Sequence, residues 1–291
     1  YQVLLAQMAG RERLVEANAK ISLGETSSAL VGPGLAGGLI QLLTAPFAIV
    51  LDALTFFVSA LMLRKIRAPR DVPHDGPRQS VNAEIVEGLK LVRHNRTLLA
   101  LAWLAGLWQL LHHMQLAVLI LFATRELGLS AGSIGIAYIF GGLGCMLAAA
   151  SAEKLSARLG VGPVIIHGLL ATAIAWQAFG LIDGPVWFAA LALGLAMLLF
   201  DFGGVLFGIN YLALRQAITP DRLLGRMTAT MRFLTVAAAP LGSLAGGALA
   251  PAIGLRGTLI TVGVLGLLLA AGAIAWSPVR RHRSLPAVAA D

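Results

Sequence analysis

Long apolar stretches recur along the chain, and short segments between them carry most of the charged residues. Eight stretches are long enough, or nearly so, to cross a hydrocarbon core, which requires about 20 helical residues. Their approximate limits are 22–44, 46–63, 97–123, 131–152, 163–182, 185–209, 227–250 and 257–276. The pattern therefore predicts an all-α membrane protein with about eight transmembrane helices.

The composition strengthens this prediction. Hydrophobic residues make up 58% of the 291 residues and charged residues only 12%, whereas a soluble domain has roughly 25% charged residues. The 33 glycines suit helices that pack closely in lipid. This composition argues against a soluble nucleic-acid-binding protein despite the net charge of +8, and the single cysteine, Cys145, excludes an internal disulfide.

The basic residues lie almost entirely on one side of the predicted spans. Nineteen of the 22 lysines and arginines fall in the N-terminal segment, the 64–96 loop, the later loops on the same side and the C-terminal tail. Only Arg125 and Arg256 fall on the other side, and Arg232 lies inside a span. Because cytoplasmic loops retain positive charge, we expect a multi-pass protein of the inner (plasma) membrane with both termini in the cytoplasm.

An internal repeat relates the first predicted span to the seventh. The Arg-Leu pair and the Leu-Ala-Gly-Gly sequence within residues 13–38 recur within residues 222–247, both displaced by 209 positions. Each copy also contains a proline, Pro33 or Pro240. A six-helix repeat unit predicts a complete protein of twelve spans, of which this chain would lack the first four. A chance match between two Ala- and Gly-rich helices is the alternative.

Three segments carry a resemblance to a known family: residues 10–67, which begin GRERLVEANAKISL, residues 125–144 (RELGLSAGSIGIAYIFGGLG) and residues 218–247. They resemble the major facilitator superfamily, in the branch that contains enterobactin exporters and macrolide efflux pumps. The first segment is similar to the fifth and sixth helices of that family, and the other two resemble its seventh-to-eighth and tenth-to-eleventh helix regions. The resemblance covers almost the whole chain and implies a twelve-helix fold that exports small molecules in exchange for protons.

On this interpretation the chain has four parts. Residues 1–63 are the last two helices of the N-terminal half, 64–96 a cytoplasmic linker, 97–279 the six-helix C-terminal half and 280–291 a cytoplasmic tail. The linker ends in an apolar stripe opposite a charged one, which predicts an amphipathic helix on the membrane surface. The stripes are Ile85, Leu89 and Val92 against Glu84, Glu87, Lys90 and Arg93. A solvated linker is the alternative.

Gly32, Pro33, Gly37 and Gly38 resemble the antiporter motif of the family's fifth helix. Proline removes a backbone donor and can bend a helix, while glycine permits close packing. We therefore expect a hinge at the seam between the two halves, with a merely kinked and well-packed helix as the alternative. The family's eighth-to-ninth helix motif is matched only in part around Arg158, which fits an ordinary basic loop.

Charged residues inside spans cost about 2.5–3.5 kcal/mol at the bilayer centre on insertion scales. Glu25, Asp201 and Arg232 are therefore candidates for a substrate or proton pathway, and each lies on a helical stripe of small residues. Consecutive helices are usually neighbours, so we expect Asp201 to pair with Arg232. Counted from Asn210 and Arg226, their depths of roughly 14 Å and 9 Å are compatible. A buried charge with only a structural role is the alternative.

The third predicted span contains Trp108, Gln109, His112 and His113. Adjacent histidines point about 100° apart on a helix, and no potential ligand follows four positions later, so no metal site is expected. One histidine could titrate near neutral pH or bind substrate by a hydrogen bond. These residues are assigned to the substrate or proton pathway, with buried structural hydrogen bonding as the alternative.

The sequence thus predicts a secondary exporter of small organic molecules (drugs, siderophores or metabolites) that works by proton antiport. Its partners would be the lipid bilayer, the substrate and protons, and no cofactor or nucleic acid is expected. The alternative is a truncated, non-transporting membrane protein or scaffold. An enzyme is not favoured, because no span presents a paired-acid, metal or nucleophile arrangement.

The uneven distribution of basic residues can be tested by cysteine labelling in intact cells. A membrane-impermeant thiol reagent applied from outside should label a cysteine placed beside Arg125 or Arg256, and should miss one placed beside Arg78. Efficient labelling beside Arg78 from outside would reverse the predicted topology.

Overall fold

The computed structural model describes residues 34–42, 44–64, 81–220 and 223–284, together with Ser28 and Gly32. Every regular element within these ranges is helical, and residues 34–42 form part of a helix that precedes α2. The later helices are α2 (Ala45–Arg64), α3 (Val81–His94), α4 (Arg96–Arg125), α5 (Ala131–Leu159), α6 (Val161–Leu181), α7 (Val186–Ala217), α8 (Leu224–Trp276) and the 3-10 helix η2 (Pro278–Arg281). The predicted all-α fold is confirmed.

Five of the described helices, α4 to α8, are long and apolar enough to cross a membrane, and α2 contains a shorter apolar stretch, Pro46–Met62. Helix α8 consists of two spans joined without a loop, because Gly254 has φ 78° and ψ 166° and interrupts the helix. The predicted spans 227–250 and 257–276 lie on either side of this break. All six spans predicted within residues 97–279 are therefore present.

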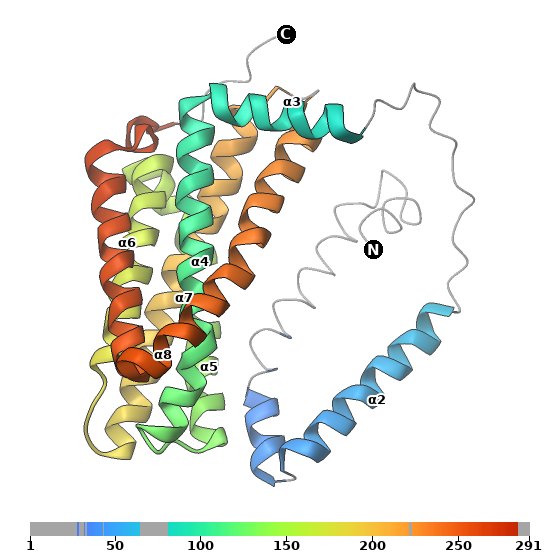
Figure 1. The fold of residues 1–291 in the computed structure, drawn as a ribbon, viewed down its shortest axis with the longest axis vertical. Helices are drawn as coiled ribbons and strands as arrows, with labels where there is room; N and C mark the ends of the chain where they lie inside the picture. The colour runs from blue at the N-terminus through green and yellow to red at the C-terminus, as the bar shows by residue number, and fades with distance from the viewer. Residues whose placement is uncertain are drawn as a thin grey trace.

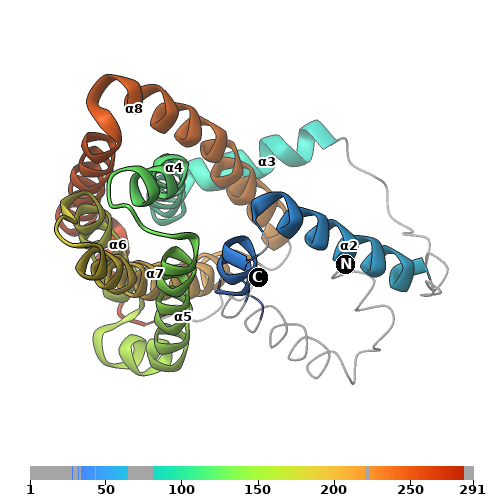
Figure 2. The same cartoon turned by 90° about the horizontal axis from the view of Figure 1, so that it is seen from below.

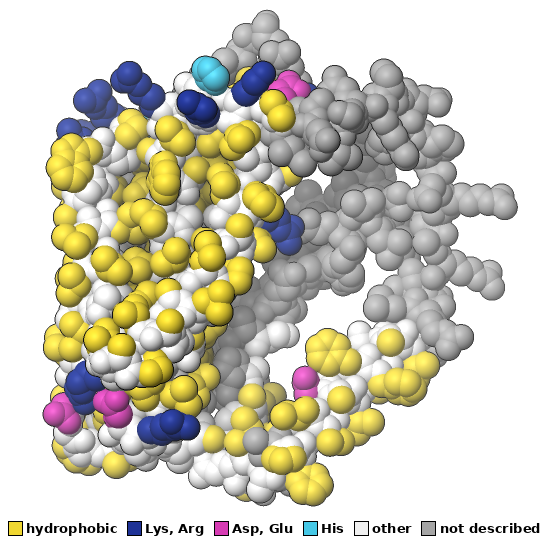
Figure 3. Space-filling model, viewed as in Figure 1, with side chains coloured by type: hydrophobic (Ala, Val, Ile, Leu, Met, Phe, Trp, Pro, Cys, Tyr) yellow, Lys and Arg dark blue, Asp and Glu magenta, His cyan; other side chains and the backbone are white. Residues whose placement is uncertain are grey.

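Helices α4 to α8 form one bundle, from which α2 diverges (Figures 1 and 2). Helix α7 packs on α5 and α6, whereas α8 packs on α4 and α6. Helix α3 lies across one end of the bundle (Figure 1). A broad hydrophobic band separates the two charged ends (Figure 3), as expected of a surface in contact with lipid.

Helices α5 and α7 continue beyond their predicted ends at residues 152 and 209, to Leu159 and Ala217. Hydropathy detects only the apolar part of a helix, and these extensions carry Lys154, Arg158 and Arg215. The extra turns project toward the end of the bundle where α3 lies (Figure 1). We call this end, where Figure 3 shows most of the lysine and arginine side chains, the basic end.

Glycines set the closest contacts between the helices. An ideal Cβ at Gly168 of α6 would lie 2.7 Å from the carbonyl oxygen of Gly203, and one at Gly203 would lie 2.7 Å from that of Gly168. Gly242 and Gly246 of α8 lie against the carbonyls of Leu110 and Met114 in α4. Small residues at such positions allow helix backbones to approach each other in lipid.

Helix α3 is formed by the segment whose apolar stripe predicts an amphipathic helix. Asn95 follows it and caps α4, with its side chain accepting hydrogen bonds from two backbone N–H groups. Val92 is buried among Met227, Met231 and Leu98. Glu87 forms an ion pair with Arg226 near the start of α8, so α3 is attached to the bundle along one face.

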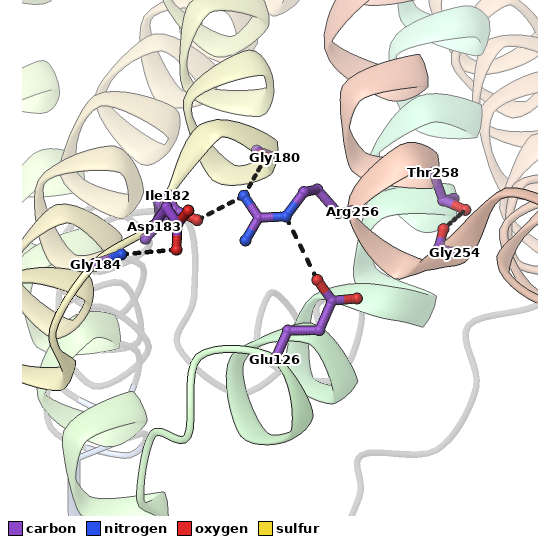
Figure 4. A network of polar contacts seen from close by, with 8 residues as sticks. All are labelled: Glu126, Gly180, Ile182, Asp183, Gly184, Gly254, Arg256 and Thr258. Carbon is purple, nitrogen blue, oxygen red and sulfur yellow. Dashed lines mark hydrogen bonds and ion pairs between the residues drawn. The ribbon is translucent and has the colours of Figure 1, made fainter.

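The opposite end of the bundle is held together by Arg256, which lies just after the break in α8 (Figure 4). Its guanidinium donates to the carbonyls of Gly180 at 3.2 Å and Ile182 at 2.9 Å, and its Nε lies 3.5 Å from Oε2 of Glu126. The guanidinium also covers the ring of Phe122 at 5.2 Å. One cation thus joins α4, the C-terminal end of α6 and α8, where helix carbonyls lack partners of their own.

The Arg256 network predicts that Arg256→Met lowers the free energy of unfolding by about 1.5–3 kcal/mol, since carbonyls that accept from a charged donor would lose their partner. Glu126→Gln should cost only about 0.2–1 kcal/mol, the range of a solvent-accessible ion pair. Denaturant-induced unfolding in detergent measures both. Arg125→Met, at an exposed position on the same end, is the control and should have little effect. Equal losses for Arg256→Met and Arg125→Met would show that the network contributes nothing.

Candidate functional site

The acid with the clearest functional potential is Asp201, near the middle of α7. Its Oδ2 lies against Gly141 of α5, in the space that a larger side chain at that position would occupy. Met197, one turn earlier on α7, faces the same glycine. Within the described part of the chain the Asp201 carboxyl makes no hydrogen bond or ion pair. A half-buried carboxyl in a span is costly without a partner, and such a group can take up a proton instead.

The predicted pairing of Asp201 with Arg232 is wrong. Asp201 faces α5, whereas the side chain of Arg232 is exposed on the first half of α8, which packs on α4. The depths of Asp201 and Arg232 within their helices also differ, because α7 continues past Asn210 to Ala217. Asp201 lies about 24 Å from that end of its helix, and Arg232 lies about 12 Å from the start of α8 at Leu224. Although α7 and α8 are consecutive in the chain, they do not pack on each other.

Trp108 and His112, both predicted site residues, lie in an aromatic cluster between α4, α6 and α7. The ring of His112 stacks at 5.1 Å on Trp108 and at 5.2 Å on Phe200. Trp108 also stacks at 5.9 Å on Phe207, and its indole N–H donates to Thr172 at 3.3 Å. Both side chains therefore point into the C-terminal bundle.

The other polar groups on this part of α4 differ in their contacts. His113 is half-buried and its Nδ1 lies 3.0 Å from the carbonyl oxygen of Gln109, one turn earlier. Nδ1 of His112 and Oε1 of Gln115 are buried, and no side chain of another described helix forms a hydrogen bond with either atom. Among the described residues, no three His, Cys, Asp or Glu side chains lie close enough together to hold a metal ion.

The sequence analysis missed the partners of these side chains. Phe200, Phe207, Thr172 and Gly141 complete the surroundings of His112, Trp108 and Asp201. Phe200 and Phe207 lie on α7, Thr172 on α6 and Gly141 on α5. Nothing in their local sequence distinguishes them from ordinary residues of apolar spans. Only the arrangement of the helices identifies them.

Of the three predicted hinge glycines, Gly37 lies at the seam between residues 34–42 and α5. An ideal Cβ at Gly37 would lie 2.7 Å from the carbonyl oxygen of Ala131 and 3.0 Å from Cα of Gly135. Gly34 likewise lies against Ile139, whereas Gly32 and Gly38 have open space around them. Glu25 and Pro33, the remaining predicted site residues, lie outside the described residues.

Comparisons with known proteins agree with this architecture. The model of a family described as transmembrane secretion effectors matches residues 1–290. Among solved structures, a bacterial homologue of the iron transporter ferroportin, in an inward-facing state, is 17% identical with a TM-score of 0.63. The match covers 94% of this chain and 66% of that one, so the chain spans slightly less than two thirds of its length.

No protein in the curated set matches the chain. At 17% identity the ferroportin homologue shows a common fold and no more. The family match, by contrast, extends over nearly every residue and agrees with the long apolar helices. The chain belongs to the transmembrane secretion effector family, a family of membrane transporters in the major facilitator superfamily.

Proposed function

We propose that this protein is a proton-coupled exporter of small organic molecules, related to the enterobactin and macrolide exporters. The observation that carries the proposal is the position of Asp201, a half-buried carboxyl in the middle of a span without a partner among the described residues. Such a carboxyl is stable when neutral and costly when charged. Exposure to alternating sides of the membrane would make it release and take up a proton in each cycle.

The seam between residues 34–42 and α5 supports alternating access. Gly37 contacts Ala131 and Gly135 at the start of α5, which is the end away from α3. Helix α2 diverges from the bundle toward the basic end (Figure 1). In the proposed cycle, the Gly37 contact would belong to an inward-facing state, the state named for the ferroportin homologue. Loss of the contact between Gly37 and α5 would then open the end away from α3.

The orientation in the membrane is part of the proposal. The basic end, with α3 and η2, would face the cytoplasm of an inner-membrane protein, and the end with Arg256 and Glu126 would face outward. In such a cycle, an opening at the basic end would give the substrate access from the cytoplasm, which is the direction that export requires.

The substrate pathway would include the half-buried Gln109 and His113, with Trp108 and His112 behind them in the bundle. Exposed in a span, Arg232 makes no ion pair within the described residues. It would contribute positive charge to the pathway. A flat aromatic surface beside polar groups suits small organic molecules that are partly apolar. If the full-length protein moves no such molecule, a non-transporting scaffold becomes the better interpretation.

The role of Asp201 predicts that Asp201→Asn in the full-length protein abolishes export driven by a pH gradient, because the amide cannot carry a proton. Downhill exchange of substrate should persist, and the folded fraction should be unchanged, since no ion pair within the described chain is lost. Everted membrane vesicles loaded with a pH-sensitive dye, and tested against a panel of fluorescent amphiphilic substrates, measure both activities. Asp183→Asn, at an exposed position between α6 and α7, should transport normally. Undiminished pH-driven export by the Asp201→Asn variant would remove Asp201 from the proton pathway.

The seam predicts different outcomes for two adjacent glycines. Gly37→Val should hold α5 away from residues 34–42, whereas Gly38→Val should be tolerated because the space around Gly38 is open. Cysteines at Gln41 and Gly132, which are in contact across the seam, can be cross-linked by a short thiol reagent once Cys145 is replaced by alanine. Cross-linking and export should both fall in Gly37→Val and remain in Gly38→Val. Equal cross-linking in the two variants would show that this contact does not control closure.

A further inference from the structure

A pocket lies at the basic end, apart from Asp201 and the aromatic cluster. It has a volume of about 360 Å³ and lies between the start of α4, the end of α8 and η2. Arg96, Arg280 and Arg281 line it together with Trp103 and Trp276, and none of the described residues in its lining is acidic. The pocket therefore combines three guanidinium groups with two indole rings.

Arg280 and Arg281 belong to the fixed turn η2, and Arg96 is the first residue of α4. The side chain of Ser277 accepts a hydrogen bond from the N–H of Val279, which is fully buried. The N–H of Gly162 donates to the carbonyl of His282 at 2.8 Å, and the His282 ring lies 3.2 Å from the hydroxyl of Thr97. These contacts fix η2 against both α4 and α6.

The positive charge in the pocket is largely uncompensated. Arg280 donates to the carbonyl of Ile274 at 2.8 Å. The side chains of Arg96 and Arg281 are exposed, and within the described residues they make no hydrogen bond or ion pair. Guanidinium groups bind phosphate oxygens through paired N–H donors, so the pocket has the charge and the donors to hold a phosphate group.

Apolar grooves flank the pocket on both sides. One, of about 310 Å³, shares Arg280 with the pocket and runs along Ile166, Leu170 and Ile274. The other, of about 450 Å³, shares Leu99 and Trp103 and continues beneath α3. Trp103 and Trp276 are 63% and 86% exposed, and exposed tryptophans favour the membrane–water interface. A free phosphate would make no use of these grooves, whereas a lipid with two acyl chains would.

We propose that this pocket binds the headgroup of an anionic phospholipid in the leaflet at the basic end, with the acyl chains in the adjoining grooves. Basic pockets between transmembrane helices are suited to such headgroups. The bound lipid would join α4 to the end of α8 and would stabilise the C-terminal half, whether or not the protein transports.

The test is thermal unfolding of the delipidated, purified protein in a mild detergent. Phosphatidylglycerol should raise the midpoint of unfolding, while phosphatidylcholine and inorganic phosphate should not. The double variant Arg96→Gln/Arg281→Gln should lose this rise. The control, Lys154→Gln/Arg158→Gln, removes the same amount of positive charge from exposed positions at the end of α5, which also lies at the basic end. The control should keep the rise. If the double variant does not fold, the single variant Arg281→Gln replaces it in the test. It should lose a smaller part of the rise in the unfolding midpoint.

Three results would overturn the proposal. An equal rise with phosphatidylcholine would mean that the grooves bind lipid without regard to the arginines. The same rise with inorganic phosphate would indicate a free-anion site. A rise that survives in the Arg96 and Arg281 variants, or is lost in the control as well, would show that general surface charge attracts the lipid.

Discussion

Close contact between helix backbones is the constraint on which the rest of this structure depends. Lipid is as apolar as the helix surfaces, so helices associate where small residues allow dense packing. The reciprocal contact of Gly168 with Gly203 joins α6 to α7, and Gly242 and Gly246 join α8 to α4. These contacts decide which helices are neighbours. The surroundings of each polar side chain follow from them.

Two half-buried charged residues have very different surroundings in the bundle. Arg256, at one end, is satisfied by two carbonyls, a carboxylate and an aromatic ring, and it joins three helices. Asp201, in the middle of α7, lies against Gly141 without a partner in the described chain. A satisfied charge stabilises one arrangement of helices. An unsatisfied carboxyl leaves its protonation open to change, which suits a residue that takes part in transport.

The two copies of the internal repeat use their glycines alike. Gly37 and Gly246 occupy equivalent positions, and each lies against the backbone of another helix, α5 in the first case and α4 in the second. Gly38 and Gly247, the next residues, both have open space around them. The repeated sequence therefore corresponds to a repeated way of packing. In the first copy, that packing forms the seam on which the proposed alternating access depends.

Local properties of the sequence determined the helices from α4 to α8, the surface helix α3 and the basic end, because hydropathy and charge act over a few turns of chain. Stripes of small residues also marked Asp201 as facing protein. Only the tertiary structure decided what it faces. Asp201 lies against Gly141 and not Arg232, because α8 packs on α4 and not on α7. Side-chain shapes on helices distant in sequence decide such choices, and no local pattern records them.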